Sequence, residues 1–263
     1  MLALPDGSRW TLLLSPPRDG VENMALDEAL MARARSTGNG VVRVYSWASP
    51  TLSLGRNQRA VGAYPAERAS ARGIAVVRRA TGGRALLHHR EITYSVTAPA
   101  PAHDSLARSY RAINAVLLEA LRTLGVQAQV ASGTTRLPPP GSAPCFEMPA
   151  PGELTVGGRK LVGSAQYREH GAMLQHGSIL VDDDQPLVAE LAAVSVPATI
   201  PAATLREALG RAPTPEEFAD ALFAAVRGAW APEATRTNVA PVDASALAAA
   251  RARYGSDAWT WRR

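Results

Sequence analysis

Cys145 and Lys160 are the only cysteine and the only lysine in a chain of 263 residues, and they lie 15 positions apart. A cysteine thiolate can act as a nucleophile. A lysine amine can lose and regain a proton, which an arginine guanidinium does not readily do. These residue types suit nucleophilic and proton-transfer chemistry. Composition alone favours the alternative, that Lys160 is a lysine spared by chance in an arginine-rich chain.

Cys145 lies in Leu137–Pro151, a segment whose Pro and Gly content predicts a loop. A lone cysteine is more often a small buried hydrophobic residue, but burial is less expected in such a loop. A loop thiol near cationic groups ionises more readily and can act as a nucleophile. The local sequence therefore favours neither an inert thiol nor a nucleophile.

Lys160 begins the second strand of a predicted β-hairpin. The strands Glu153–Val156 and Lys160–Gln166 flank Gly157-Gly158, which is a typical two-residue hairpin turn. Gly163 and Ser164 are small residues inside the second strand, and they indicate close approach of a ligand or of another backbone. Without further context, a solvated lysine beside a turn is the better explanation of Lys160.

A glycine loop follows a predicted strand in the segment Arg78-Arg79-Ala80-Thr81-Gly82-Gly83-Arg84-Ala85. Paired glycines allow close approach of the backbone, and their N–H groups can line a site for an anion or a carbonyl oxygen. The segment is neither a Walker A loop nor a dinucleotide fingerprint. A tight turn between strands is the alternative.

The five histidines do not predict a metal site. His88-His89 follows the glycine loop, His176 precedes a predicted strand, and His103 and His170 fall in predicted loops. None of them shows the spacing of histidines or carboxylates that zinc sites use. No Gly-x-Ser-x-Gly element is present, which argues against an α/β-hydrolase.

Composition excludes several classes of protein. The chain is 46% hydrophobic and 19% charged, which is typical of a globular protein, and its single cysteine excludes an internal disulfide. The net charge is +5. Because the arginines are scattered and aromatic residues are few, we expect an acidic protein as partner rather than nucleic acid. We also expect no signal peptide, no membrane span and a cytoplasmic location.

The elements that must position these residues are predicted from periodicity and capping signals. Helices are expected at Glu22–Arg35, at Ser105–Leu124, and after the capping box of Thr214 and Glu217. Strands are expected in Val41–Trp47, Thr51–Leu54, Ile74–Arg78, Arg84–Thr97, Val126–Ala131, Ala172–Gln175 and Ser178–Val181. Since strands and helices do not alternate strictly, the predicted class is α+β. We expect a single domain over 1–263, with a linker at Ser195–Ala203 and a helical tail from about residue 204 to 263.

Taken together in order, these segments resemble the lipoate-protein ligase and octanoyltransferase family, whose catalytic domain is related to that of biotin protein ligases. The resemblance covers nearly the whole chain. It implies mixed, largely antiparallel β-sheets flanked by helices. The segments that carry it are Asn23–Glu28, Arg43–Trp47, Ser53–Gln58, Arg78–Ala85, Glu91–Ser95, Gly158–Gln166, Gln175–Ser178 and Arg253–Trp259.

Within this family, three features resemble the cysteine-dependent octanoyltransferases. Cys145 stands in Ala143–Glu147, where those enzymes carry their nucleophile. Arg84 follows Gly82-Gly83, where ATP-dependent ligases usually have a third glycine. The chain also lacks the length for the additional small domain of many ligases. The alternatives are a ligase that works through lipoyl-AMP, a lipoyl-domain octanoyl amidotransferase, and a non-catalytic binding protein for acyl groups or lipoyl domains.

The resemblance implies a site and partners. Cys145 and Lys160 would be catalytic, and no metal or cofactor is expected, ATP and Mg²⁺ being needed only by a ligase. Octanoyl-acyl carrier protein would be the donor, a lipoyl-domain protein such as the glycine cleavage H protein the acceptor, and the enzyme a monomer. His89 departs from the Asp or Gln that is common at its position. The implied substrate-binding residues are Arg79, Thr81, Gly82, Gly83, Arg84, His88, Gly163, Ser164, Ala165 and His176.

Overall fold

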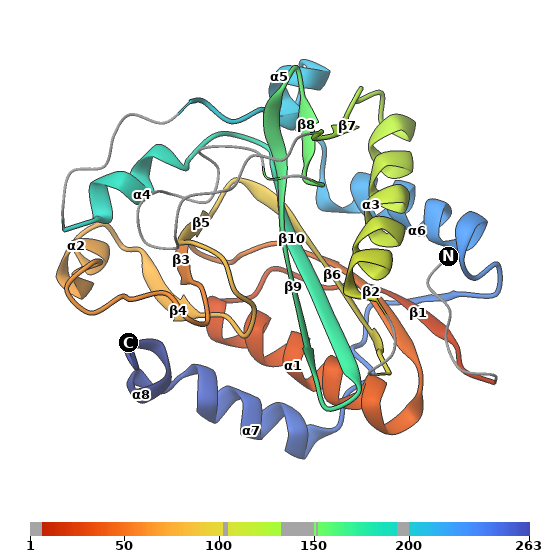
Figure 1. Ribbon diagram of the computed structural model, residues 1–263, viewed down its shortest axis with the longest axis horizontal. Helices are drawn as coiled ribbons and strands as arrows, with labels where there is room; N and C mark the ends of the chain where they lie inside the picture. Colours follow the sequence, from red (N-terminus) through yellow and green to blue (C-terminus); the bar gives the residue numbers. More distant parts are fainter. Residues whose placement is uncertain (1–6, 102–104, 133–149, 151, 194–199) are drawn as a thin grey trace.

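The computed structural model describes residues 7–101, 105–132, 150, 152–193 and 200–263. Within these ranges a large sheet of eight strands runs through the molecule (Figure 1). Its spatial order is β11 (Thr235–Thr237), β1 (Trp10–Leu14), β2 (Gly40–Tyr45), β6 (Glu91–Pro99), β10 (Ala172–Leu180), β9 (Arg159–Glu169), β8 (Leu154–Val156) and β7 (Gln129–Val130).

The type of strand pairing changes once across this sheet. The edge formed by β11, β1 and β2 is parallel, whereas every pairing from β2 to β7 is antiparallel. A second sheet of three strands has β3 (Thr51–Leu54) between β4 (Ala75–Arg78), which is parallel to it, and β5 (Leu86–His88), which is antiparallel. The predicted α+β class with mixed, largely antiparallel sheets is therefore confirmed.

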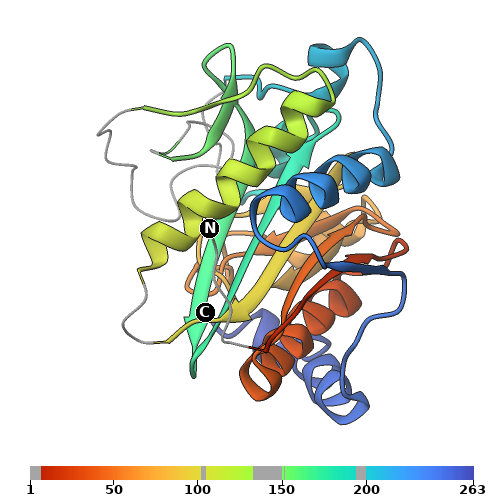
Figure 2. The ribbon, with the colours of Figure 1, turned by 90° about the vertical axis from the view of Figure 1, so that its right-hand side faces the viewer.

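Helices cover both faces of the large sheet. Figure 2 shows α3 (Leu106–Thr123) and α6 (Pro215–Ala229) lying together over one face. On the other face, α1 (Gly20–Thr37) packs against β6 and β10. The remaining helices are α2 (Ala66–Ser70), α4 (Pro186–Leu191), α5 (Leu205–Leu209), α7 (Ala244–Tyr254) and α8 (Asp257–Thr260).

Local signals explain why the three long helices form where they do. Asp19 caps α1 by accepting the Glu22 N–H, and Gly38 ends this helix in the left-handed conformation. Ser105 caps α3 in the same way. The predicted capping box of Thr214 and Glu217 is present at the start of α6.

The two faces of the large sheet have different chemistry. On β6, Ile92, Tyr94 and Val96 join the main apolar core under α3 and α6. The alternate residues of the strand point to the opposite face, toward α1. On that face a polar layer is buried, to which β2, β6 and β10 contribute Arg43, Glu91, Thr93, Ser95, His176 and Ser178. The helices of the apolar face thus stabilise the sheet, while the face toward α1 can position polar groups.

The structure corrects the predicted strand break at His176-Gly177. β10 runs without interruption from Ala172 to Leu180 and pairs with β6 and β9. Gly177 does not make a turn. A Cβ atom there would lie 2.6 Å from the Tyr94 ring, so the glycine is required by close packing within the sheet.

Other boundaries differ because partner strands decide them. The segment Arg84–Thr97 forms two strands, β5 and β6, which belong to different sheets. Val126–Ala131 contributes only the short β7. The tail contains the predicted helices, and it also adds β11 to the edge of the large sheet beside β1. Of the described chain, no helix has both the length and the apolar character that crossing a membrane would need.

Replacing Arg43 by methionine tests the buried polar layer. The Arg43 guanidinium is fully buried and donates to Asp27 Oδ1 at 2.8 Å. Because the substitution leaves a buried carboxylate without its cation, we expect the free energy of unfolding to fall by about 3–5 kcal/mol. Urea denaturation measures this loss.

Arg251→Met is the matched control, since Arg251 pairs with Glu22 in an exposed position. An exposed pair contributes at most about 1 kcal/mol. Equal losses in the two variants would contradict a special role for the buried pair.

Candidate active site

A β-bulge in β9 determines where Lys160 points. Leu154 pairs with Val162, but the next residue, Thr155, pairs with Lys160, so one residue of β9 is extra at this point. The bulge reverses the alternation of side chains. Lys160 therefore lies on the face opposite to Val162, together with Gly163 and Ala165 and on the side of α1. Gly157 and Gly158 form the predicted turn, with φ values of 56° and 76°.

Lys160 is buried and has a carboxylate partner. Its side chain is 2% exposed, and Nζ lies 2.7 Å from Glu153 Oε1. Glu153 Oε2 accepts the backbone N–H of Ala150 at 2.7 Å, which fixes the carboxylate. Sequence reasoning missed Glu153, although its place at the start of the same hairpin was a usable signal. An amine held in this way is oriented rather than free to rotate in water.

Hydrogen bonds and close packing hold the glycine loop in place. Arg79 Nη1 donates to the Ser53 carbonyl at 2.8 Å and Nη2 donates to the Arg84 carbonyl at 2.6 Å. Gly55, which is not among the predicted site residues, also supports the loop. A Cβ atom there would lie 2.0 Å from the Gly83 carbonyl oxygen, so only glycine fits.

Within this braced loop, exposure differs sharply between neighbours. Gly82 and Gly83 are exposed, while Thr81 and Arg84 on either side of them are buried. Gly83 has a φ of 99°, which favours glycine. The loop therefore presents a bare stretch of backbone to solvent between two anchored ends.

His176 connects the loop to the large sheet. Its Nε2 lies 2.7 Å from Thr81 Oγ1, and its Nδ1 lies 3.5 Å from Asp27 Oδ2. Burial lowers the pKa of His176, although Asp27 opposes the shift, and we assign the neutral ring. These partners assign the proton to Nδ1, facing Asp27, so that Nε2 accepts a hydrogen bond from the Thr81 hydroxyl.

Asp27 is in turn held by three other groups. It accepts hydrogen bonds from Arg43 and Ser95 at 2.8 Å and from Tyr45 at 3.1 Å. Burial opposes its ionisation, but Arg43 and His176 outweigh that effect and hold the pKa of the carboxyl below its usual range.

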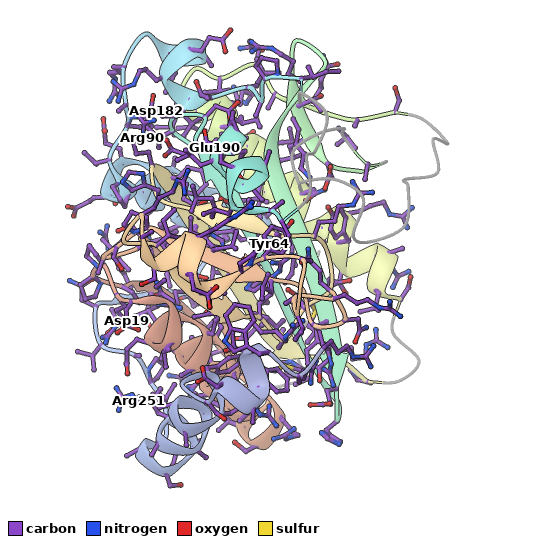
Figure 3. All side chains as sticks on the ribbon, turned by 90° about the vertical axis from the view of Figure 1, so that its left-hand side faces the viewer. Asp19, Tyr64, Arg90, Asp182, Glu190 and Arg251 are labelled. Atoms are coloured by element: carbon purple, nitrogen blue, oxygen red, sulfur yellow. The ribbon has the colours of Figure 1, made fainter. Side chains whose placement is uncertain are left out.

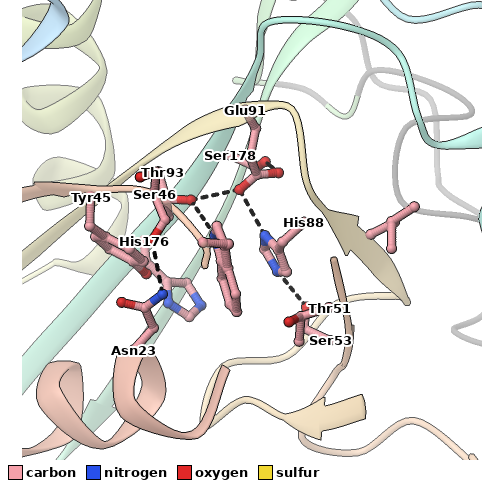
Figure 4. Close-up of polar contacts among 12 residues, drawn as sticks. Asn23, Tyr45, Ser46, Thr51, Ser53, His88, Glu91, Thr93, His176 and Ser178 are labelled. Atoms are coloured by element: carbon pink, nitrogen blue, oxygen red, sulfur yellow. Dashed lines mark hydrogen bonds and ion pairs between the residues drawn. The ribbon is translucent and has the colours of Figure 1, made fainter. Parts of the chain in front are cut away.

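His88 makes a second connection of the same kind. Its ring lies between Glu91 and Ser53, with Nδ1 2.8 Å from Glu91 Oε1 and Nε2 2.8 Å from Ser53 Oγ (Figure 4). Glu91 also accepts from the hydroxyls of Thr93 and Ser178. With both ring nitrogens engaged, His88 ties the small sheet to the large one.

Ser164 lies apart from its predicted neighbours. Gly163 pairs with Ser178 and Ala165 pairs with His176, which places both small residues on the face of the polar layer. Ser164 points to the opposite face, where its hydroxyl lies 2.8 Å from the Tyr94 hydroxyl. The floor beside Lys160 thus consists of Gly163 and Ala165.

His89 belongs to a surface network. It is 43% exposed, and its Nδ1 lies 3.1 Å from Asp184 Oδ2. Arg90 pairs with the same Asp184 and with Asp182, and Figure 3 shows Arg90 and Asp182 next to each other. These contacts show that His89 is the partner of a carboxylate near the surface.

Three residues considered in the sequence remain: His170, Cys145 and His103. His170 occupies the turn between β9 and β10. Cys145 and His103 lie outside the described residues. No group of three or more His, Cys, Asp or Glu side chains that could hold a metal ion occurs in the part of the chain that the structure describes.

The described groups suit a particular kind of chemistry. Lys160, which has a carboxylate partner, shares a face of β9 with Gly163 and Ala165, and the glycine loop with its exposed Gly82 and Gly83 is bonded to the same face of the sheet through Thr81 and His176. A floor of small residues can take a narrow apolar chain, while the amine and the loop can act on a carbonyl group at its end.

Known proteins resemble this chain over most of its length. Residues 19–227 match the model of the family described as lipoyl protein ligase A/B catalytic domain. Octanoyltransferase LipM of Symbiobacterium thermophilum is 38% identical, and the match covers 97% of this chain and 99% of that protein. Octanoyltransferase LipM of Kyrpidia tusciae is 47% identical over 66% of this chain and 67% of its own length.

Solved structures share the fold. A lipoate-protein ligase A bound with ATP superimposes with a TM-score of 0.74 at 20% identity, covering 97% of this chain and 98% of that one. A bipartite lipoate protein ligase from Thermoplasma acidophilum, solved in a study that includes its E2 lipoyl domain, gives a TM-score of 0.71 at 19% identity, with coverage of 97% and 96%. The chain belongs to the lipoyl protein ligase A/B catalytic domain family.

Proposed function

We propose that this protein is an octanoyltransferase of lipoate biosynthesis. The observation that carries the proposal is the orientation of the buried Lys160 by the bulge of β9 onto the floor formed by Gly163 and Ala165. The relatives named octanoyltransferase LipM, one of which matches over nearly its full length, support the same activity. The acceptor is the lysine of a lipoyl-domain protein.

The reaction proceeds by two acyl transfers through Cys145. The Cys145 thiolate attacks the carbonyl carbon of octanoyl-acyl carrier protein, and the carrier thiol leaves and takes up a proton. The ε-amine of the acceptor lysine then attacks the octanoyl-cysteine thioester, loses a proton and forms an amide, while the Cys145 thiolate leaves. Exchange between thioesters is nearly thermoneutral, so formation of the amide drives the second step.

Lys160 serves as the proton-transfer group of both steps. As an ammonium ion it stabilises the Cys145 thiolate and polarises the thioester carbonyl. As an amine it accepts the proton that the attacking lysine releases. The contact of 2.7 Å with Glu153 orients Nζ and supplies the counter-charge that a buried cation needs.

The glycine loop and the floor bind the acyl group. The exposed backbone of Gly82 and Gly83 offers N–H groups for the developing oxyanion, and Arg79 and His88 hold this loop in place. Gly163 and Ala165 lack the side-chain bulk that would block an apolar chain. The enzyme acts as a monomer without metal or cofactor, and its +5 charge favours acidic partners such as an acyl carrier protein and the glycine cleavage H protein.

Mass spectrometry of the intact protein tests the nucleophile. After incubation with octanoyl-acyl carrier protein, we expect the wild type to gain one octanoyl group and Cys145→Ala to gain none, because alanine cannot form the thioester. Hydroxylamine should remove the adduct from the wild type. An adduct on Cys145→Ala would contradict the assignment of the nucleophile.

Replacing Lys160 by arginine tests the proton-transfer role. Arginine keeps the positive charge but does not readily release a proton, so we expect kcat to fall by about 10²–10⁴-fold. Transfer to the acceptor lysine, followed by mass spectrometry, measures the rate. Glu153→Gln is the companion variant, in which the amine remains but loses its carboxylate, and a smaller loss is expected. Activity of Lys160→Arg near that of the wild type would exclude proton transfer by this residue.

A further inference from the structure

The C-terminal segment Trp259–Arg263 lies against the small sheet. α8 packs against β4, and the residues after it continue along the loop that follows β3 (Figure 1). In that loop the backbone N–H groups of Ala60 and Val61 donate to the Arg263 backbone oxygen at 2.8 and 3.0 Å. The segment is therefore fixed beside the strand that leads into the glycine loop.

Arg78, the last residue of β4, joins this segment to the turn Gly55–Gln58. Its Nε donates to the Thr260 carbonyl at 2.8 Å, 182 positions away in the sequence. Its Nη1 donates to the carbonyls of Gly55 at 2.6 Å and Gln58 at 2.8 Å. The side chain is fully buried, and the hydrogen bonds described for it all go to backbone carbonyl oxygens. One guanidinium thus holds two distant backbone segments together.

The C-terminal segment makes further hydrogen bonds to the same two places. Trp259 Nε1 donates to the Arg78 carbonyl at 2.8 Å. Arg262 Nη2 donates to the Arg56 carbonyl, inside the turn, at 2.6 Å. The Arg262 guanidinium also lies 3.9 Å from the centroid of the Trp259 ring. The segment therefore holds the backbone of Arg78 and the turn at once.

The turn in its own right contacts the glycine loop directly. The backbone N–H of Arg56 donates to the Thr81 carbonyl at 2.8 Å. Gly55 packs against the Gly83 carbonyl so closely that a side chain does not fit. Since Thr81 and Gly83 stand on either side of Gly82, any shift of the turn moves the exposed part of the loop.

We propose that Arg78 is a positioning residue, which uses the C-terminal segment to set the place of the exposed Gly82–Gly83 backbone. Its effect on catalysis rests on the proposed function, in which the N–H groups of this backbone stabilise the developing oxyanion. Because Arg78 is fully buried and bonds only to backbone carbonyls in the described chain, it acts through the loop and not on the acyl group.

Single-turnover acylation of Arg78→Lys tests this role. Lysine keeps the charge but lacks the planar fork of donors that spans the two segments. Octanoyl-acyl carrier protein is mixed with excess over enzyme, and mass spectrometry of the intact protein follows the octanoyl adduct. A misplacement of about 1 Å can reduce a rate about 10²-fold, so we expect a fall of this order in the rate constant at saturating donor. The donor concentration for half-saturation should stay close to that of the wild type.

This measurement separates positioning from stability. The rate constant does not depend on how much of a variant is folded, whereas the amplitude of the adduct does. An unchanged rate constant in Arg78→Lys, with or without a loss of amplitude, would overturn the positioning role.

Two further variants complete the comparison. Arg227→Lys is the matched control, because Arg227 Nε donates to the Ala234 carbonyl at 3.0 Å beside α6, and its rate constant should equal that of the wild type. Trp259→Phe keeps an aromatic ring but loses the donor to Arg78, so it should lower the rate constant by a smaller factor. It tests the same connection should Arg78→Lys fail to fold. An equal fall in Arg227→Lys and Arg78→Lys would contradict a specific role.

Hydrogen exchange of the full chain tests the positioning without any activity. We expect faster exchange of Arg79–Ala85 and Gly55–Gln58 in Arg78→Lys and Trp259→Phe, with α3 unchanged as internal reference. Unaltered exchange of the glycine loop in both variants would overturn the positioning role while the proposed function stands. Absence of an octanoyl adduct on the wild type would overturn the proposed function, whereas the positioning of the loop would still be decided by exchange.

Discussion

The buried ion pair between Asp27 and Arg43 supports the arrangement of the site. Arg43 lies on β2 of the large sheet and Asp27 lies on α1, so the pair fixes the helix on the polar face. Asp27 also faces His176, which in turn bonds Thr81 of the glycine loop. A buried pair stabilises only when its remaining polar groups are bonded, and here Asn23, Ser15, Ser95 and Tyr45 supply those bonds. The position of the loop therefore depends on a charge pair that no substrate needs to touch.

The two faces of the large sheet have different roles, one in stability and the other in chemistry. The face under α3 and α6 is an apolar core. Truncating a side chain of this core would reduce the stability of the fold without altering any polar group of the site. The opposite face places polar side chains between sheet, helix and loop, where each must find a partner. Two histidines meet this need in the same way, since each stands between a hydroxyl and a carboxylate. Because each imidazole ring has a partner at both nitrogens, the two histidines fix the position of the small sheet and its glycine loop relative to Gly163 and Ala165.

Much of the fold could be predicted because its signals are local. Caps and apolar periodicity located α1, α3 and α6, and Gly157-Gly158 located the hairpin that carries Lys160. The predictions failed where a distant segment decides the outcome. The predicted strands stopped on either side of Gly177, but Tyr94 on the neighbouring strand is the reason for a glycine there. The same limit hid Gly55, whose lack of a side chain is explained only by the approach of the Gly83 carbonyl.

The sequence by itself determined which groups are available for chemistry: one thiol, one primary amine, a pair of loop glycines and a strand with small residues. The resemblance of eight ordered segments to a known family then implied the kind of reaction that these groups perform. Only the tertiary structure decided which way they point. Regular alternation would have placed Lys160 with Val162 on the apolar face, and the bulge of β9 moved it to the face with Gly163. The structure also paired Thr81 with His176 across 95 positions of the chain, because hydrogen bonds between distant segments form only when the sheets and helices bring them together.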